Sequence, residues 1–120
     1  EHSRRRDVSP ASDALTPVEV LTLAALADRP RYGYELVERI ETLSGGRVTV
    51  RPGNLYRVIH RLVGRGLAEE VRHAPGQEVD PRRQYFGATE AGRREAAGQL
   101  AMYARILEGT PDLGKALGDA

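Results

Sequence analysis

The chain has 120 residues and a formal net charge of +1, and 40% of its residues are hydrophobic, so it can form one domain around one core. It contains no cysteine, which excludes a disulfide framework and a thiolate metal site. Its three histidines are scattered along the chain, so we expect no metal ion and no other cofactor. Its longest apolar stretch, around residues 21–27, is too short to span a bilayer, and no signal-peptide pattern is evident, so we expect a cytoplasmic protein.

Residues 1–14 have little apolar content and contain the basic run Arg4-Arg5-Arg6, which is typical of a flexible arm. The run is either a solubilising tail or a contact for a phosphate backbone or minor groove. A first helix is predicted directly after the arm, because Thr16 and Glu19 enclose a proline in a capping-box pattern. This helix should end near Ala27, and apolar side chains cover more than half of its circumference, which predicts deep packing.

A second helix is predicted from Tyr32 or Gly33 to the glycine pair at 45–46, with apolar side chains at helical spacing. Tyr32 and Tyr34 flank Gly33 at its start. They either frame backbone amides that accept a phosphate or pack under the first helix. For Tyr34 we expect a place in the core.

A third helix is predicted from Pro52 to the glycines at 64 and 66, and it separates two kinds of side chain. Its apolar face consists of Leu55, Val58, Ile59 and Leu62. The opposite face, rich in hydrogen-bond donors, consists of Asn54, Tyr56, Arg57, His60 and Arg61. Because residues 51–65 contain four arginines and no acid, positive charge is concentrated on this helix.

Two strand-like runs follow, at residues 67–72 and 83–88, and a turn-rich loop joins them. The pattern predicts a β-hairpin with a long, mobile tip. This tip ends in two basic residues, Arg82 and Arg83, which can reach nucleic acid beside the third helix.

A final helix is predicted over residues 89–109, with Thr89 as its cap, and a tail follows over residues 110–120. A near-heptad stripe along this helix consists of Leu100, Tyr103 and Leu107. The stripe is either a seam between two copies of the chain or a packing surface against the first helix. Because little of the chain is left to cover the stripe, we expect a dimer interface.

The order helix, helix, basic helix, β-hairpin, helix is that of a winged helix-turn-helix domain, here over residues 15–88 of a mostly helical chain. A helix that reads the major groove must bury one face and present donors on the other, as the third helix does. The residues expected to read bases are Asn54, Arg57, His60 and Arg61. Those expected to contact phosphate are Arg51, Tyr56, Arg82 and Arg83. Two assignments have alternatives, since Tyr56 can equally be a packing residue and His60 an ordinary surface residue.

Several spaced motifs occur together in one known family: Arg31-Tyr32-Gly33-Tyr34-Glu35-Leu36, Pro52-Gly53-Asn54-Leu55-Tyr56, and Thr89-Glu90-Ala91-Gly92-Arg93. Over about residues 15–108 the chain resembles the PadR family of bacterial transcriptional regulators. The resemblance implies a winged-helix domain, a homodimer joined through the C-terminal helix, and repression by operator binding. The single C-terminal helix is similar to that of the compact branch of the family.

The chain departs from the pattern of that family at the third helix and also at Gly87-Ala88, which replaces a bulkier end to the second wing strand. Arg51 stands where the family often has a serine, and Arg57 where it commonly has a proline, so a base preference cannot be transferred. Members that bind planar drugs sandwich them between aromatic side chains, and this chain has one phenylalanine and no tryptophan. The sequence argues against such a pocket and leaves open a small-molecule effector of unknown identity.

Together these features predict a sequence-specific DNA-binding transcriptional regulator, a repressor that binds a pseudo-palindromic operator as a homodimer. Half-sites are expected roughly one helical turn apart. One alternative is a winged-helix protein-interaction module without specific DNA binding, and another is a regulator of a different winged-helix family that senses a small molecule in a dimer cleft. An enzyme is not expected, because Ser44, His60 and Asp80 fall on unrelated elements.

Overall fold

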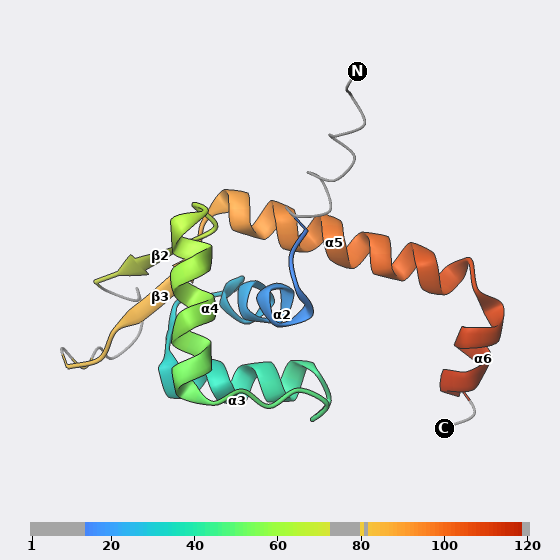
Figure 1. Ribbon diagram of the computed structural model, residues 1–120, viewed down its shortest axis with the longest axis horizontal. Helices are drawn as coiled ribbons and strands as arrows, with labels where there is room; N and C mark the ends of the chain where they lie inside the picture. Colours follow the sequence, from blue (N-terminus) through green and yellow to red (C-terminus); the bar gives the residue numbers. More distant parts are fainter. Residues whose placement is uncertain (1–13, 73–79, 81, 119–120) are drawn as a thin grey trace, which may run out of the picture.

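The computed structural model describes residues 14–72, 80 and 82–118. Figure 1 shows its elements in chain order: α2 (Pro17–Leu26), β1 (Arg31–Tyr32), α3 (Gly33–Leu43), α4 (Pro52–Gly64), β2 (Ala68–Val71), β3 (Tyr85–Ala88), α5 (Glu90–Glu108) and α6 (Pro111–Gly118). The predicted order of helices and hairpin strands is confirmed within this part of the chain. The predicted arm, apart from residue 14, and most of the hairpin tip, residues 73–79 and 81, lie outside the described residues.

Helix α2 is the centre of the domain, and its start follows from local sequence. Thr16 Oγ1 accepts a hydrogen bond from Glu19 N at 3.2 Å, and Glu19 Oε1 accepts one from Thr16 N at 2.8 Å, which confirms the predicted capping box. The helix contacts α3, α4 and α5, and its Leu23 and Leu26 are completely buried. The contacts on several sides confirm the deep packing expected from its apolar circumference.

The predicted hairpin is part of a three-stranded antiparallel sheet with the order β1-β3-β2. Phe86 of β3 is aligned with Glu70 of β2 on one side and with Arg31 of β1 on the other. The sequence does not reveal β1, because two residues are too few to show the alternation that marks a strand. Through β1 the sheet is joined directly to the start of α3.

Helix α4 has the two faces that the sequence predicts. Leu55, Ile59 and Leu62 are completely buried, and the helix packs against α2 and α3. Pro52 lies in the first turn, where an N–H group would have no partner within the helix. Arg51 is the N-cap residue, and its side chain makes no capping hydrogen bond, so the guanidinium group is not used to start the helix.

Helix α5 packs on α2 with its first half, and its second half extends beyond the domain (Figure 1). Gln99 marks the boundary, since its Nε2 donates to Leu15 O at 2.6 Å and its Oε1 accepts from Leu15 N at 3.2 Å. Every residue from 100 to 109 is exposed.

Pro111–Gly118, which belong to the predicted tail, form helix α6. A second helix forms here because a proline ends one helix and also suits the first turn of the next. In Figure 1 the chain bends sharply between α5 and α6.

Candidate nucleic-acid interface

The outward face of α4 carries the side chains that the sequence assigns to base reading. These exposed residues are Asn54, Arg57, His60 and Arg61. Arg57 Nη2 donates to Asn54 Oδ1 at 2.8 Å, so the side chains of these two residues, which are one helical turn apart, are in direct contact. Because α4 itself contains no acid, its outward face presents amide, guanidinium and imidazole groups without a carboxylate among them.

Arg61 lies on this face and is also tied to α2. Its Nε donates to Oε2 of Glu19 at 3.3 Å; the Glu19 side chain is 6% exposed and the Arg61 side chain 55%. From the sequence, Glu19 is expected only in the capping box of α2. No sequence signal indicates this second contact, because the two residues are 42 positions apart.

Tyr56 is half-buried, and its ring contacts Phe86 of β3 edge to face, with centroids 6.2 Å apart. Its hydroxyl lies against Gly33, where an added Cβ would be 2.9 Å from Tyr56 Oη. The ring therefore packs between α4, the sheet and the start of α3. A glycine at position 33 is what allows this close approach.

The two tyrosines at the start of α3 have different environments. Tyr34 is 71% exposed, so the expectation that it lies in the core was wrong. The reason is that α3 turns Leu36 and Ile40 toward the core, and position 34 lies off that face. Tyr32 is half-buried, and its ring meets that of Tyr85 edge to face at 5.6 Å.

The described part of the hairpin tip is organised around one acid, Asp80. It accepts a hydrogen bond from Arg82 Nη2 at 3.2 Å and lies 3.7 Å from Arg83 Nε. The hydrogen bonds from Arg82, with the charge of Arg83, hold the pKa of Asp80 below its ordinary value of 3.8. Arg83 also lies over the Tyr32 ring, with Cζ 4.1 Å from the ring centroid. Contacts with other residues of the protein thus fix the orientation of both arginine side chains.

A cavity of about 270 Å³ lies between the hairpin, the start of α3 and α4. Its lining residues are Tyr32, Gly33, Tyr34, Tyr56, Arg82, Arg83 and Gln84. They supply three phenol groups, two guanidinium groups and one amide, and no carboxylate. Such a set of donors at the positive end of a helix dipole favours an anionic oxygen.

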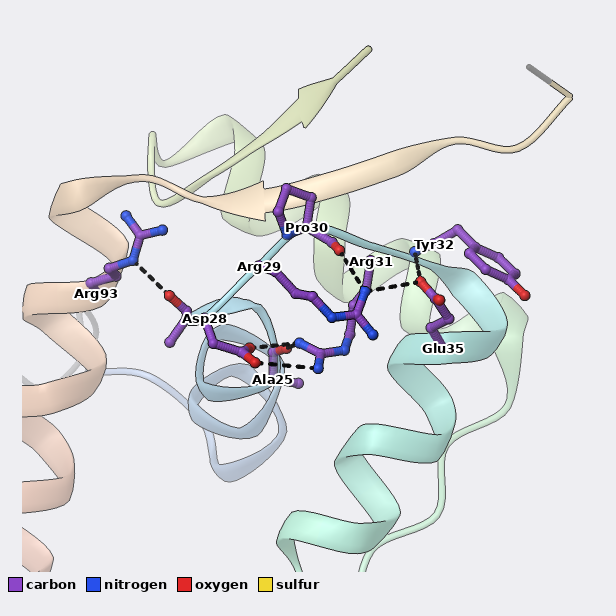
Figure 2. Close-up of polar contacts among 9 residues, drawn as sticks. Ala25, Asp28, Arg29, Pro30, Arg31, Tyr32, Glu35 and Arg93 are labelled. Carbon is purple, nitrogen blue, oxygen red and sulfur yellow. Dashed lines mark hydrogen bonds and ion pairs between the residues drawn. The ribbon is translucent and has the colours of Figure 1, made fainter. Parts of the chain in front are cut away.

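A separate polar cluster holds the connection from α2 to α3 (Figure 2). Arg31, whose side chain is 8% exposed, donates to Asp28 Oδ1 at 2.7 Å, and this hydrogen bond lowers the pKa of Asp28 below 3.8. Arg29 Nη1 lies 3.8 Å from Glu35, which also accepts a hydrogen bond from Tyr32 N at 3.2 Å. These contacts fix β1 and the first turn of α3, which form one side of the cavity.

The stripe predicted as a dimer interface lies on the half of α5 that extends beyond the domain. Leu100, Tyr103 and Leu107 are 44%, 38% and 42% exposed, so α2 does not cover them. Further exposed apolar side chains on α5 and α6 are Met102, Ile106, Leu113 and Leu117. The exposed apolar surface is therefore wider than the predicted stripe and continues onto α6.

Over residues 22–98 the chain matches the family described as Transcriptional regulator PadR-like. The chain belongs to this family. Membership confirms the resemblance inferred from the spaced motifs, and it makes the protein a member of a family of regulators rather than of enzymes. Within the described part of the chain, no helix combines the length and hydropathy that a membrane span requires.

One relative of this PadR-like chain is an uncharacterized 37.1 kDa protein in transposon TN4556 of Streptomyces fradiae, with 35% identity over 94 residues. The match covers 75% of this chain and 25% of that protein, so the chain spans a quarter of its relative's length.

Two solved structures of PadR family transcriptional regulators have the same fold. The regulator from Eggerthella lenta DSM 2243 is 26% identical, with a TM-score of 0.59 and 80% of each chain covered. The regulator from Clostridium difficile R20291 is 16% identical, with a TM-score of 0.65 over 82% of this chain and 98% of that one. These similarities confirm the predicted winged-helix fold.

Proposed function

We propose that this PadR-like chain is a sequence-specific DNA-binding regulator of the cytoplasm, and that it represses transcription as a homodimer on a pseudo-palindromic operator. The observation that carries the proposal is the donor surface formed by the exposed face of α4 and the cavity beside it. A DNA duplex offers acceptors on its base edges and negative charge on its backbone, which such a surface complements.

In this proposal, residues on the outward face of α4 read the bases. The buried face of this helix anchors it to α2 and α3, which leaves the opposite face free to enter a major groove. Asn54 suits the N6 and N7 atoms of adenine, Arg57 suits the O6 and N7 atoms of guanine, and His60 lies on the next turn. Each bidentate contact contributes about 1–3 kcal/mol of discrimination between bases.

Residues at the edge of the same surface contact the phosphates. Arg51, Arg82, Arg83 and the Tyr56 hydroxyl surround the cavity or the N-terminus of α4. A phosphate that enters the cavity would replace Asp80 as the partner of Arg82, exchanging one anion for another at little cost in desolvation. These contacts are independent of sequence, so their share of the affinity weakens as salt rises.

A second copy of the chain covers the apolar surface of α5 and α6 in this proposal. Leu100, Tyr103 and Leu107 supply the seam, and Leu113 and Leu117 extend it. An isologous interface of this kind places two copies of α4 in successive major grooves, about 34–36 Å apart.

The binding test is fluorescence anisotropy with DNA upstream of the gene, or with a duplex recovered by genomic-fragment selection, against a scrambled duplex at two salt concentrations. We expect wild-type protein to prefer the specific duplex and to lose affinity for both duplexes as salt rises. Arg57→Ala should lower specific affinity by about 5- to 100-fold. Arg94→Ala is the matched control, because it removes one exposed arginine that is paired with Glu90 on α5.

The assembly test is sedimentation of Leu100→Asp, which places a charge in the seam and should convert the dimer to a monomer. A dimer that survives this change would locate the interface elsewhere. Binding without any preferred duplex after fragment selection would reject the regulator in favour of a winged-helix module that binds a protein.

A further inference from the structure

The contact between Glu19 and Arg61 joins the capping box of α2 to the exposed face of α4. Glu19 Oε1 accepts from Thr16 N at 2.8 Å, and Glu19 Oε2 accepts from Arg61 Nε at 3.3 Å. Both carboxylate oxygens are therefore occupied by groups from different elements. A carboxylate whose side chain is 6% exposed needs such partners, because burial without them is costly.

Arg61 uses only the inner edge of its guanidinium group in this contact. The Nε–H group points to Glu19. Within the described residues Nη1 and Nη2 make no hydrogen bond, and the side chain as a whole is 55% exposed. A guanidinium group is planar and rigid, so fixing its Nε edge also fixes the direction of the remaining N–H groups. Arg61 itself is an exposed residue on the same outward face of α4 as Asn54 and Arg57.

We propose that Glu19 is a positioning residue for DNA recognition, which holds Arg61 by its Nε edge so that the Nη groups are oriented toward the DNA. This inference rests on the proposed function. An arginine that is held before binding loses less side-chain freedom in the complex, and this preorganisation increases affinity for the correct site. Glu19 thus affects recognition from the supporting helix without touching DNA.

Electrostatics alone predicts the opposite effect of removing Glu19. A carboxylate close to the DNA-facing surface repels phosphate, so its neutralisation should tighten binding to every duplex. If Glu19 positions Arg61, neutralisation should weaken binding to the specific duplex and have little effect on the scrambled one. The sign of the change therefore separates the two effects.

The experiment uses the full chain and compares Glu19→Gln, Arg61→Lys and the double variant by anisotropy on the selected duplex and a scrambled duplex. Glutamine keeps an acceptor for Thr16 N, so the cap is retained, and it lacks the charge that holds Arg61. We expect each single variant to lower specific affinity about tenfold, and the double variant to be little worse than either. The control is Glu95→Gln, which neutralises an exposed acid on α5.

Several outcomes would overturn the inference while leaving the proposed function intact. The first is a Glu19→Gln protein whose affinity for the specific duplex is unchanged or higher. The second is a double variant in which the losses of the two single variants add. The third is a loss of affinity for both duplexes that follows the folded fraction measured by circular dichroism. If Glu19→Gln does not fold, Arg61→Lys decides alone, since lysine retains the charge without the fork and full specific affinity would refute the role. A wild-type protein that prefers no duplex would instead reject the proposed function itself.

Discussion

Substitution of Gly92 by alanine tests how closely α5 approaches the rest of the domain. A Cβ at this position would lie 2.0 Å from Leu67 O, 2.9 Å from Leu67 C and 3.2 Å from Leu23 Cδ2. An ordinary contact between carbon and oxygen is about 3.3 Å or more, so the start of α5 would have to move by roughly 1 Å. The obstructing atoms belong to backbone, which cannot rotate away as a side chain can.

The movement would strain the contacts that begin α5. Thr89 Oγ1 accepts from Gly92 N at 3.0 Å, and Thr89 N donates to Leu67 O at 3.0 Å. Overpacking of this kind costs about 1–3 kcal/mol, and a strained hydrogen bond adds about 1 kcal/mol. We therefore expect Gly92→Ala to lower the free energy of unfolding by about 3 kcal/mol, which lowers Tm by about 10–15 °C in a domain of this size.

Gly98→Ala is the matched control on the same helix, because its added Cβ meets no atom within 4 Å. An exposed helical glycine replaced by alanine should gain up to about 1 kcal/mol. Urea denaturation followed by far-UV circular dichroism, at one protomer concentration for all variants, measures both changes. A Gly92→Ala protein within about 0.5 kcal/mol of wild type, or one stabilised like the control, would refute the reasoning.

Three further predictions concern contacts that hold the domain together. Gln99→Ala removes both hydrogen bonds to the buried backbone of Leu15 and should lower the free energy of unfolding by about 1–3 kcal/mol in urea titrations; no change would show that water replaces the amide. Thr89→Ala removes the cap of α5 and should cost about 0.5–2 kcal/mol, with Thr89→Ser as the variant that restores it. Asp28→Asn should destabilise the protein at neutral pH, because the buried Arg31 loses its charged partner. Since the pKa of Asp28 is lowered in the folded state, its stabilisation is complete above 3.8 and is lost as pH falls through the lowered pKa, so the two stability curves should converge in acid.

Local sequence was sufficient for most of the helices and for the surface that we assign to DNA. The capping box at Thr16 and Glu19 lies within four residues, and the two faces of α4 follow from a 3.6-residue period, so neighbours along the chain determine them. The PadR-like family was likewise evident from short motifs whose spacing is visible in one dimension.

Contacts between distant residues decided the rest. Strand β1 exists because Arg31 and Tyr32 lie beside β3, and two residues carry no periodic signal of their own. Tyr34 was predicted from the sequence to lie in the core, but its side chain is exposed. Its environment depends on which face of α3 packs against the neighbouring elements.

The pair formed by Glu19 and Arg61 shows the difference at the proposed interface. Each residue has an evident local role, one in a helix cap and one on a basic face. That they meet depends on the packing of α2 against α4, which brings residues 42 positions apart to 3.3 Å. Sequence periodicity determines which side of a helix is buried, and only the packing of whole elements determines which buried acid lies under which exposed arginine.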